Sequence, residues 1–197
     1  RTALTRLEGE GLIRSQHGAA TCVQDFRATG GLPLLTHLAE QKLAAGEMPL
    51  ALLRDVLELR RVLAVEVLGL VAERATREEL NHLRAHHQLM RDNRADALSF
   101  MALDLAFARM MVVGTHNLAL ELLYNTVARL VEQHPLARPA FLTNPEGTIA
   151  VYEKLLDLLD QRDVERVRNV SRGLLTRLDR RLLDKLDPLG STRVRDV

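Results

Sequence analysis

The chain has few of the residues that mark several protein classes. Its 197 residues include one cysteine, no tryptophan and only 3% aromatic residues. The single cysteine, Cys22, excludes an intramolecular disulfide and is typical of a reducing compartment. The sequence also lacks a signal peptide and any apolar run long enough to span a bilayer, so we expect a cytoplasmic protein without a membrane partner.

The balance of charges excludes a broadly basic surface. Lysine and arginine number 27 against 26 aspartate and glutamate residues, which gives a net charge of +1 at pH 7. Nucleic-acid binding would therefore have to come from a local patch. Hydrophobic residues make up 47% of the chain, enough for a folded core. No nucleophile elbow, glycine-rich phosphate loop or catalytic triad spacing is present, so we expect no enzyme activity.

Helical periodicity dominates the chain after residue 31. Apolar residues recur three and four positions apart, which predicts an antiparallel bundle of about seven helices. Thr76 and Glu79 form a capping-box pattern at the start of one of them. The expected helices cover residues 32–45, 49–75, 76–94, 97–117, 117–136, 148–160 and 163–186. The polar tail, 187–197, is expected to be disordered.

The first 24 residues have a different pattern. Leu4 and Leu7 indicate the end of an amphipathic helix that stops at Gly11. Two short β-prone runs, 12–15 and 21–24, then predict a small hairpin with its tip at residues 16–20. A helix followed by a hairpin is the pattern of a winged helix, and a hairpin that packs on the bundle fits the same residues equally well.

Three polar side chains on apolar helix faces are the main chemical signal. Asp104 lies in a stripe with Phe100 and Phe107, and Arg60 and Tyr152 lie on the apolar faces of two other helices. A buried carboxylate is costly unless it is paired. One interpretation is a structural Arg60–Asp104 ion pair, and the other is an effector pocket with converging polar groups. The two are compatible, because the acid group of a ligand could exchange partners with the pair.

Two histidines have a spacing that would suit a metal. His82 and His86 are four residues apart on one predicted helix. Their neighbours Asn81, Arg84 and Gln88 are polar. We therefore interpret both histidines as part of a solvated face.

The start of the chain resembles part of a known DNA-binding domain. The resemblance is to the second half of a GntR-type winged helix-turn-helix, and the matching run is RTALTRLEGEGLIRSQHGAATCVQDF. It is closest to the FadR subfamily, through the wing tip at 16–18 and the Thr-Gly-Gly-Leu linker at 29–32. A weaker similarity continues through ELRRVL (58–63), the Asp104 helix and YEKLLDLLDQRD (152–163). The first two DNA-binding helices of the family have no counterpart, so we expect an N-terminally truncated member.

The resemblance implies a mainly α fold and a regulator of transcription. Residues 1–24 would be a partial winged helix-turn-helix, 25–31 a linker and 32–186 a helical FCD domain for effector binding and dimerisation. A homodimer of this kind binds palindromic operator DNA. The expected contacts to DNA lie on the recognition helix and the wing, at Arg1, Arg6, Arg14, Gln16, His17 and Gly18.

The resemblance also bears on the effector and on metals. Many members of the family bind a divalent metal in the effector domain through one aspartate and three histidines. This sequence keeps Asp104 but has Ala108, Tyr152 and Leu174 at the histidine positions. Because a metal needs several nitrogen or oxygen ligands, we predict no metal and no cofactor.

The absent histidines favour a long-chain acyl-CoA as the effector, as the FadR subfamily implies. A small organic acid is the alternative effector. The alternative function is a helical ligand-binding or protein-interaction module that does not bind DNA. The residues expected at the effector site are Arg60, Asp104, Ala108, Asn117, Tyr124, Tyr152 and Leu174.

Overall fold

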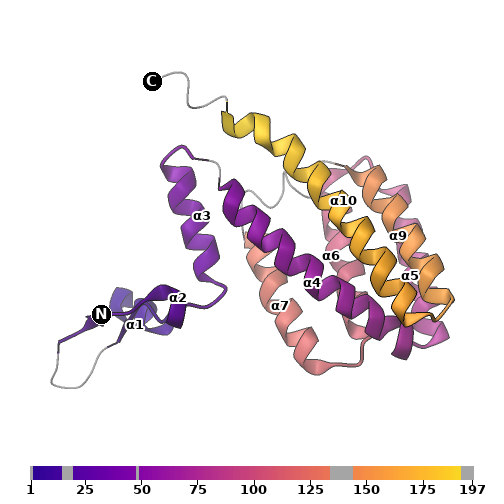
Figure 1. Ribbon diagram of the computed structural model, residues 1–197, viewed down its shortest axis with the longest axis horizontal. Coiled ribbons are helices and arrows are strands. Elements are labelled where there is room, and N and C mark those ends of the chain that lie inside the picture. Colours follow the sequence, from indigo (N-terminus) through magenta and orange to yellow (C-terminus); the bar gives the residue numbers. More distant parts are fainter. Residues whose placement is uncertain (1, 15–19, 48, 134–143, 192–197) are drawn as a thin grey trace. The chain divides into compact units, whose positions relative to one another are not determined.

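The structure is a computed structural model that describes residues 2–14, 20–47, 49–133 and 144–191. These residues are mainly helical, as the sequence predicts (Figure 1). The chain divides into two compact units, with the boundary after Leu52. Segment 32–52 therefore clusters with the first unit, although the sequence analysis assigned it to the effector domain. The domain boundaries of the whole protein stay a prediction.

The first unit contains the predicted hairpin. Strands β1 and β2 pair antiparallel, with Ile13 opposite Val23 and Arg14 opposite Cys22. The predicted tip lies mostly outside the described residues. The elements of this unit are α1 (Thr2–Gly9), β1 (Ile13–Arg14), β2 (Cys22–Val23), α2 (Phe26–Thr29) and α3 (Leu34–Ala44).

A glycine turn and a helical turn join these elements. Gly11 has a φ of +75°, a left-handed conformation that favours glycine. The Thr29 hydroxyl donates a hydrogen bond to the Gly11 carbonyl at 2.6 Å, so α2 is tied to this turn. The side chain of Asp25 caps α2 by accepting from the Arg27 amide at 3.0 Å. The predicted linker thus contains one turn of helix, which is too short to show periodicity in the sequence.

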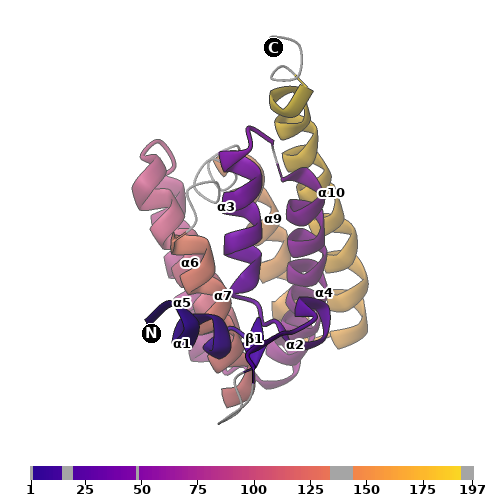
Figure 2. The same cartoon turned by 90° about the vertical axis from the view of Figure 1, so that its left-hand side faces the viewer.

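The second unit is a helical bundle (Figures 1 and 2). Helix α5 packs on α6 and α9, α9 packs on α10, and α6 packs on α7. The described helices are α4 (Leu50–Arg74), whose first three residues belong to the first unit, α5 (Arg77–Asp92), α6 (Ala97–Val113), α7 (Leu118–Gln133), α9 (Pro145–Asp160) and α10 (Val164–Ser191). None of the helices in the described ranges is long and apolar enough to cross a membrane.

Local signals set the ends of these helices. The predicted capping box is present, because Thr76 Oγ1 accepts from the Glu79 amide at 3.1 Å and the Glu79 carboxylate accepts from the Thr76 amide at 2.7 Å. Helix α9 begins earlier than predicted because Asn144 caps it and Pro145 suits the first turn. Helix α10 continues to Ser191, beyond the expected end at residue 186.

Helices α4 and α10 run antiparallel, with polar contacts along their length. Arg168 on α10 lies across Gly69 on α4, where an added Cβ would come within 2.7 Å of its Nε atom. That Nε lies 3.2 Å from the Glu66 carboxylate. Arg162 donates to the Ala72 carbonyl at 3.2 Å. The missing side chain at Gly69 therefore lets a charged side chain pass between the two helices.

Candidate functional site

Asp104 is buried in the middle of α6, as its place in an apolar stripe predicts. It is 7% exposed, between the fully buried Phe100 and Phe107. Its carboxyl group receives a hydrogen bond from the Tyr152 hydroxyl on α9. The Oδ1 atom has no hydrogen-bond partner among the described residues. An unsatisfied buried oxygen is uncommon and calls for an explanation.

The environment favours the neutral forms of both side chains. Burial raises the pKa of Asp104 above its ordinary value, while the Tyr152 hydrogen bond and the charges of Arg60 and His86 oppose this rise. Burial also raises the pKa of Tyr152, and the nearby Asp104 carboxylate raises it further. The two side chains thus place a carboxyl group and a hydrogen-bonded hydroxyl in an apolar site, where a ligand could find polar partners.

Aromatic rings enclose this pair on one side. Phe107 stacks on Tyr152 with ring centroids 4.3 Å apart and planes at 16°. The ring of His86 lies 6.2 Å from that of Phe107. His86 is half-buried, and its Nε2 donates to the Leu103 carbonyl at 2.8 Å. The interpretation of His86 as solvated is therefore wrong, because α5 packs on α6 at this point, whereas His82 is exposed as expected.

Arg60 pairs with a residue that the sequence analysis did not identify. It contacts Asp179 on α10, so the predicted Arg60–Asp104 ion pair is wrong. Arg61 contacts the other oxygen of Asp179 at 3.0 Å. The charge of Arg60 still acts on Asp104 and Tyr152. Asp179 could have been found by the signal that revealed Asp104, since it too falls within an apolar helical stripe.

The other expected effector residues occupy different environments. The Tyr124 hydroxyl donates to the Leu105 carbonyl. Leu174 is buried in the core and Ala108 is half-buried on α6. Asn117 caps α7 by accepting from the Ala119 amide at 3.0 Å. Contact of these four residues with an effector stays a prediction.

The residues beside Asp104 do not fit the metal site of the resembled family. Ala108 and Leu174 have no side-chain atom that could ligate a metal. The hydroxyl of Tyr152 is hydrogen-bonded to Asp104 itself. In the part of the chain that the structure describes, no three acidic, histidine or cysteine side chains are grouped as a metal would require. The prediction that no metal is needed awaits a metal analysis of the purified protein.

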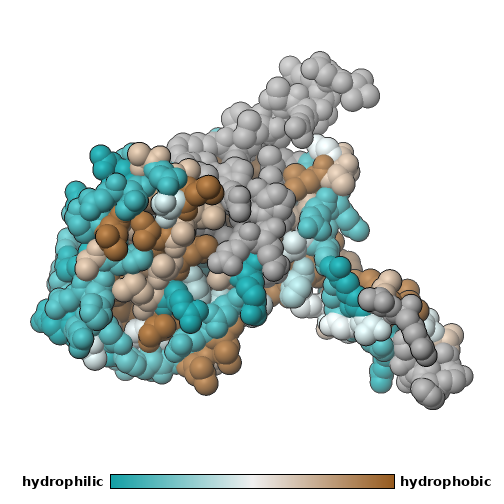
Figure 3. Space-filling view, turned by 180° about the vertical axis from the view of Figure 1, so that it is seen from behind, coloured by the Kyte–Doolittle hydropathy of each residue, from teal (hydrophilic) through white to brown (hydrophobic). Residues whose placement is uncertain are grey.

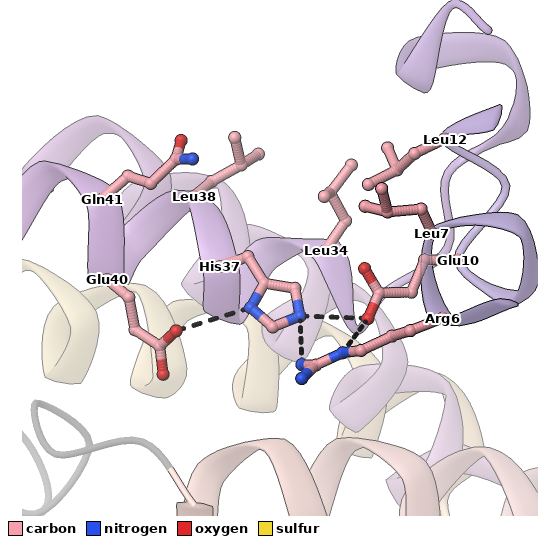
Figure 4. A pocket seen from close by; sticks show the side chains of 9 residues that line it. All are labelled: Arg6, Leu7, Glu10, Leu12, Leu34, His37, Leu38, Glu40 and Gln41. Atoms are coloured by element: carbon pink, nitrogen blue, oxygen red, sulfur yellow. Dashed lines mark hydrogen bonds and ion pairs between the residues drawn. The ribbon is translucent and has the colours of Figure 1, made fainter. Parts of the chain in front are cut away.

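The first unit contains a polar cluster around one predicted DNA contact (Figure 4). Arg6 Nε donates to the Glu10 carboxylate at 2.9 Å, and Arg6 Nη2 lies 3.1 Å from His37 Nε2. The hydrogen bond from Arg6 lowers the pKa of Glu10 below its ordinary value, with a smaller contribution from His37. The Arg6 side chain is nevertheless 67% exposed, and its contact with DNA stays a prediction.

An open groove lies beside this cluster. It has a volume of about 470 Å³ between α1 and α3, and leucines from both helices form its apolar part (Figure 4). Arg14 is exposed on β1. The remaining predicted DNA contacts, Arg1, Gln16, His17 and Gly18, lie outside the described residues.

Comparison with known proteins identifies the helical unit. The sequence profile of the FCD domain matches residues 55–177, more than half of the chain. The chain belongs to the FCD domain family. The matched residues include Arg60, Asp104 and Tyr152 but end before Asp179.

Relatives of this FCD domain protein are regulators by name. The HTH-type transcriptional regulator Mce2R of Mycobacterium tuberculosis is 29% identical over 175 residues, which cover 89% of this chain and 71% of that protein. An uncharacterised HTH-type transcriptional regulator of Mycobacterium bovis gives the same values. A second uncharacterised one, from M. tuberculosis, is 34% identical over 128 residues, 64% of this chain and 50% of that protein.

A solved structure shares the fold. Streptococcus agalactiae GntR superimposes with a TM-score of 0.59 at 17% identity, over 90% of this chain and 78% of that one. At this identity the likeness shows the fold alone. The profile match shows the FCD domain, which is the effector domain that the resemblance implies. The resemblance found in the sequence is confirmed at this level.

The buried carboxyl group of the FCD domain predicts a pH-dependent stability. Because the folded state raises the pKa of Asp104 above 3.8, it binds the proton more tightly than the unfolded state does. The free energy of unfolding should therefore fall as the pH rises through the interval between the two pKa values. Asp104→Asn removes this titration. The difference between the melting temperature of the Asp104→Asn protein and that of wild type should therefore increase with pH. Each kcal/mol corresponds to about 2–4 °C for a domain of this size.

Thermal unfolding of both proteins, followed by circular dichroism from acidic to neutral pH, measures this difference. Asp92→Asn provides a control, because Asp92 is exposed at the end of α5. A difference between wild type and Asp104→Asn that stays constant with pH would contradict the raised pKa.

Proposed function

We propose that the protein is a DNA-binding transcriptional regulator of the GntR family, FadR type, controlled by an effector in its FCD domain. The names of the mycobacterial relatives support the regulatory role. The helix and paired strands of the first unit support DNA binding through a winged helix. In such a protein, contacts to phosphates and base edges come from the recognition helix and the wing.

The main support for an effector site is that, among the described residues, the buried Oδ1 atom of Asp104 has no hydrogen-bond partner. The Tyr152 hydroxyl is bonded to the same carboxyl group, and Phe107 stacks on the Tyr152 ring. A polar group of a ligand would satisfy this oxygen. Small-molecule sites are mostly apolar with a few converging polar groups, and the surroundings of Asp104 have this composition.

A long-chain acyl-CoA is the effector that we propose first. The FadR resemblance and the absence of metal-binding side chains at Ala108, Tyr152 and Leu174 support it. A small organic acid is the second candidate. It is favoured by the charge of Arg60, which acts on the same buried pair and would attract a carboxylate.

Exposed apolar side chains of the bundle support the proposed homodimer. Leu59 and Val62 on α4 are 39% and 57% exposed, and Leu118 and Leu122 on α7 are 69% and 58% exposed. Hydrophobic patches interrupt the otherwise polar surface of the bundle in Figure 3. A two-fold dimer would also match the symmetry of a palindromic operator.

The proposal predicts that the effector changes operator affinity. An effector acts on DNA binding only if it binds two conformations of the protein differently, and such coupling is typically about 1–3 kcal/mol. We therefore expect oleoyl-CoA to change operator affinity about 5–150-fold. The Asp104→Ala protein should bind operator with nearly wild-type affinity but respond less to oleoyl-CoA. Fluorescence anisotropy with an operator selected from random duplexes, at fixed salt, measures both quantities.

Each outcome has a distinct meaning. A response to small organic acids but not to oleoyl-CoA would replace the first effector with the second. Asp104→Ala protein that responds like wild type would remove Asp104 from the site. If no duplex is selected although the dimer is folded and binds oleoyl-CoA, the protein is a ligand-binding module that does not bind DNA.

A further inference from the structure

Asp179 is a buried carboxylate held by two neighbouring arginines. It is 3% exposed on α10, and Arg60 binds its Oδ1 atom while Arg61 binds its Oδ2 atom. Both arginines come from consecutive positions of α4. A buried charge that loses all its partners is strongly destabilising. Here one arginine can leave while the other keeps the carboxylate paired.

The two arginines differ in their relation to the proposed effector site. The charge of Arg60 acts on both Asp104 and Tyr152. The described interactions place Arg61 at Asp179 alone. The Arg60 side chain is also more exposed, at 37% against 25% for Arg61. Arg60 is therefore bound to Asp179 and also influences the Asp104–Tyr152 pair electrostatically. Its partly exposed side chain can adopt another position.

Among the described ion pairs at Asp179, one cation is in excess. Two guanidinium groups face the single carboxylate of Asp179. Burial raises the pKa of Asp104, which opposes compensation of this charge by its carboxyl group. An anion that binds beside Asp104 would balance this charge, and bidentate pairing with a guanidinium group would orient it.

We propose that Asp179 competes with an anionic effector for Arg60, so that effector binding transfers Arg60 from Asp179 to the effector. This inference rests on the effector site proposed above and adds its regulation. The transfer leaves Asp179 bound to Arg61 alone and weakens the attachment of α4 to α10 at this end. The contacts of Arg168 with Glu66, and of Arg162 with Ala72, hold the opposite end.

The position of this contact makes it suitable for signalling. Arg60 lies in the first half of α4, and the first residues of that helix, up to Leu52, belong to the other compact unit. A change at the Arg60 end of α4 therefore acts on the helix that joins the two units. The two arrangements of Arg60 are the two states that an effector must distinguish in order to alter DNA affinity.

The test uses two substitutions with opposite expected effects. Asp179→Asn removes the competitor, so affinity for oleoyl-CoA and for free oleate should rise about tenfold, while the effect of either probe on operator binding should shrink. Arg61→Gln leaves Asp179 dependent on Arg60, so the probes should bind several-fold more weakly. Oleyl alcohol, which has no anionic group, should bind each variant as it binds wild type. Isothermal titration calorimetry measures the affinities, and circular dichroism checks the fold.

The outcomes separate this inference from the proposed function. If wild type binds the anionic probes and the Asp179→Asn protein binds them equally or more weakly, Asp179 does not compete for Arg60. The same conclusion follows if Arg61→Gln tightens binding, a measurement that stands even if the asparagine variant fails to fold. Wild type that binds neither oleoyl-CoA nor oleate would instead overturn the acyl effector and this inference with it.

Discussion

Replacing Gly11 with alanine is expected to abolish operator binding while the helical bundle stays folded. Gly11 has a φ of +75°, where a residue with a Cβ atom is disfavoured by about 1–2 kcal/mol. Its added Cβ would lie 2.3 Å from the carbonyl oxygen of Thr29, a backbone atom that cannot move away without shifting α2. The Thr29 hydroxyl also bonds to the Gly11 carbonyl. The substitution thus disrupts the turn that sets β1 against α1.

Gly46 provides the matched control. It has a similar φ of +78°, but an added Cβ would have no neighbour within 4 Å. Gly46→Ala should therefore cost only the backbone strain, about 1–2 kcal/mol, and leave operator affinity nearly unchanged. Fluorescence anisotropy measures operator affinity, and thermal unfolding reports on the bundle. Wild-type operator affinity in the Gly11→Ala protein would show that the turn tolerates the clash or that the first unit does not bind DNA.

Replacing Phe107 with alanine is expected to cost about 3–5 kcal/mol of stability and to release Tyr152. Phe107 is 1% exposed, and it stacks on the Tyr152 ring at a centroid distance of 4.3 Å. The chain has two tyrosines and no tryptophan, so tyrosine signals are easily assigned. The near-ultraviolet circular dichroism of the tyrosines should weaken in the Phe107→Ala protein, because Tyr152 loses its fixed neighbour. Binding of the effector should weaken as well.

Phe100→Ala separates the loss of stability from the effect on the site. Phe100 is also 1% exposed on α6, and its removal should cost a similar free energy of unfolding. The tyrosine signal and effector affinity should nevertheless stay near wild type. Denaturant unfolding of each variant measures the cost. Equal losses of tyrosine signal in the two variants would mean that the signal follows the core as a whole and not the stacked ring.

The sequence predicted features whose causes are local. The capping box at Thr76, the hairpin strands and the buried position of Asp104 follow from residues close together in the chain. The partner of Arg60 could not be predicted in this way. Arg60 reaches Asp179 because α4 and α10 are antiparallel neighbours, and helical periodicity gives the buried face of each helix without its register against another.

In the candidate site, too, some features were predicted and some contacts between helices were not. Asp104 and Tyr152 were expected to converge, and their hydrogen bond brings them together. His86 was misread because polar neighbours in the sequence say nothing about the helix that packs opposite. The effector contact expected at Asn117 stays a prediction, but its role as the cap of α7 was not predicted. Its place directly before an amphipathic helix was the available signal for a cap.

The close approach at Gly69 restricts how this sequence can diverge. A Cβ at position 69 would meet the guanidinium group of Arg168, whose Nε is held by Glu66 on the same helix as Gly69. An alanine at position 69 therefore fits only with a shorter or displaced side chain at position 168, and the loss of Arg168 in turn leaves Glu66 without its partner across the helix pair. Positions 66, 69 and 168 are therefore expected to covary among FCD domains in which α4 and α10 pack in this way.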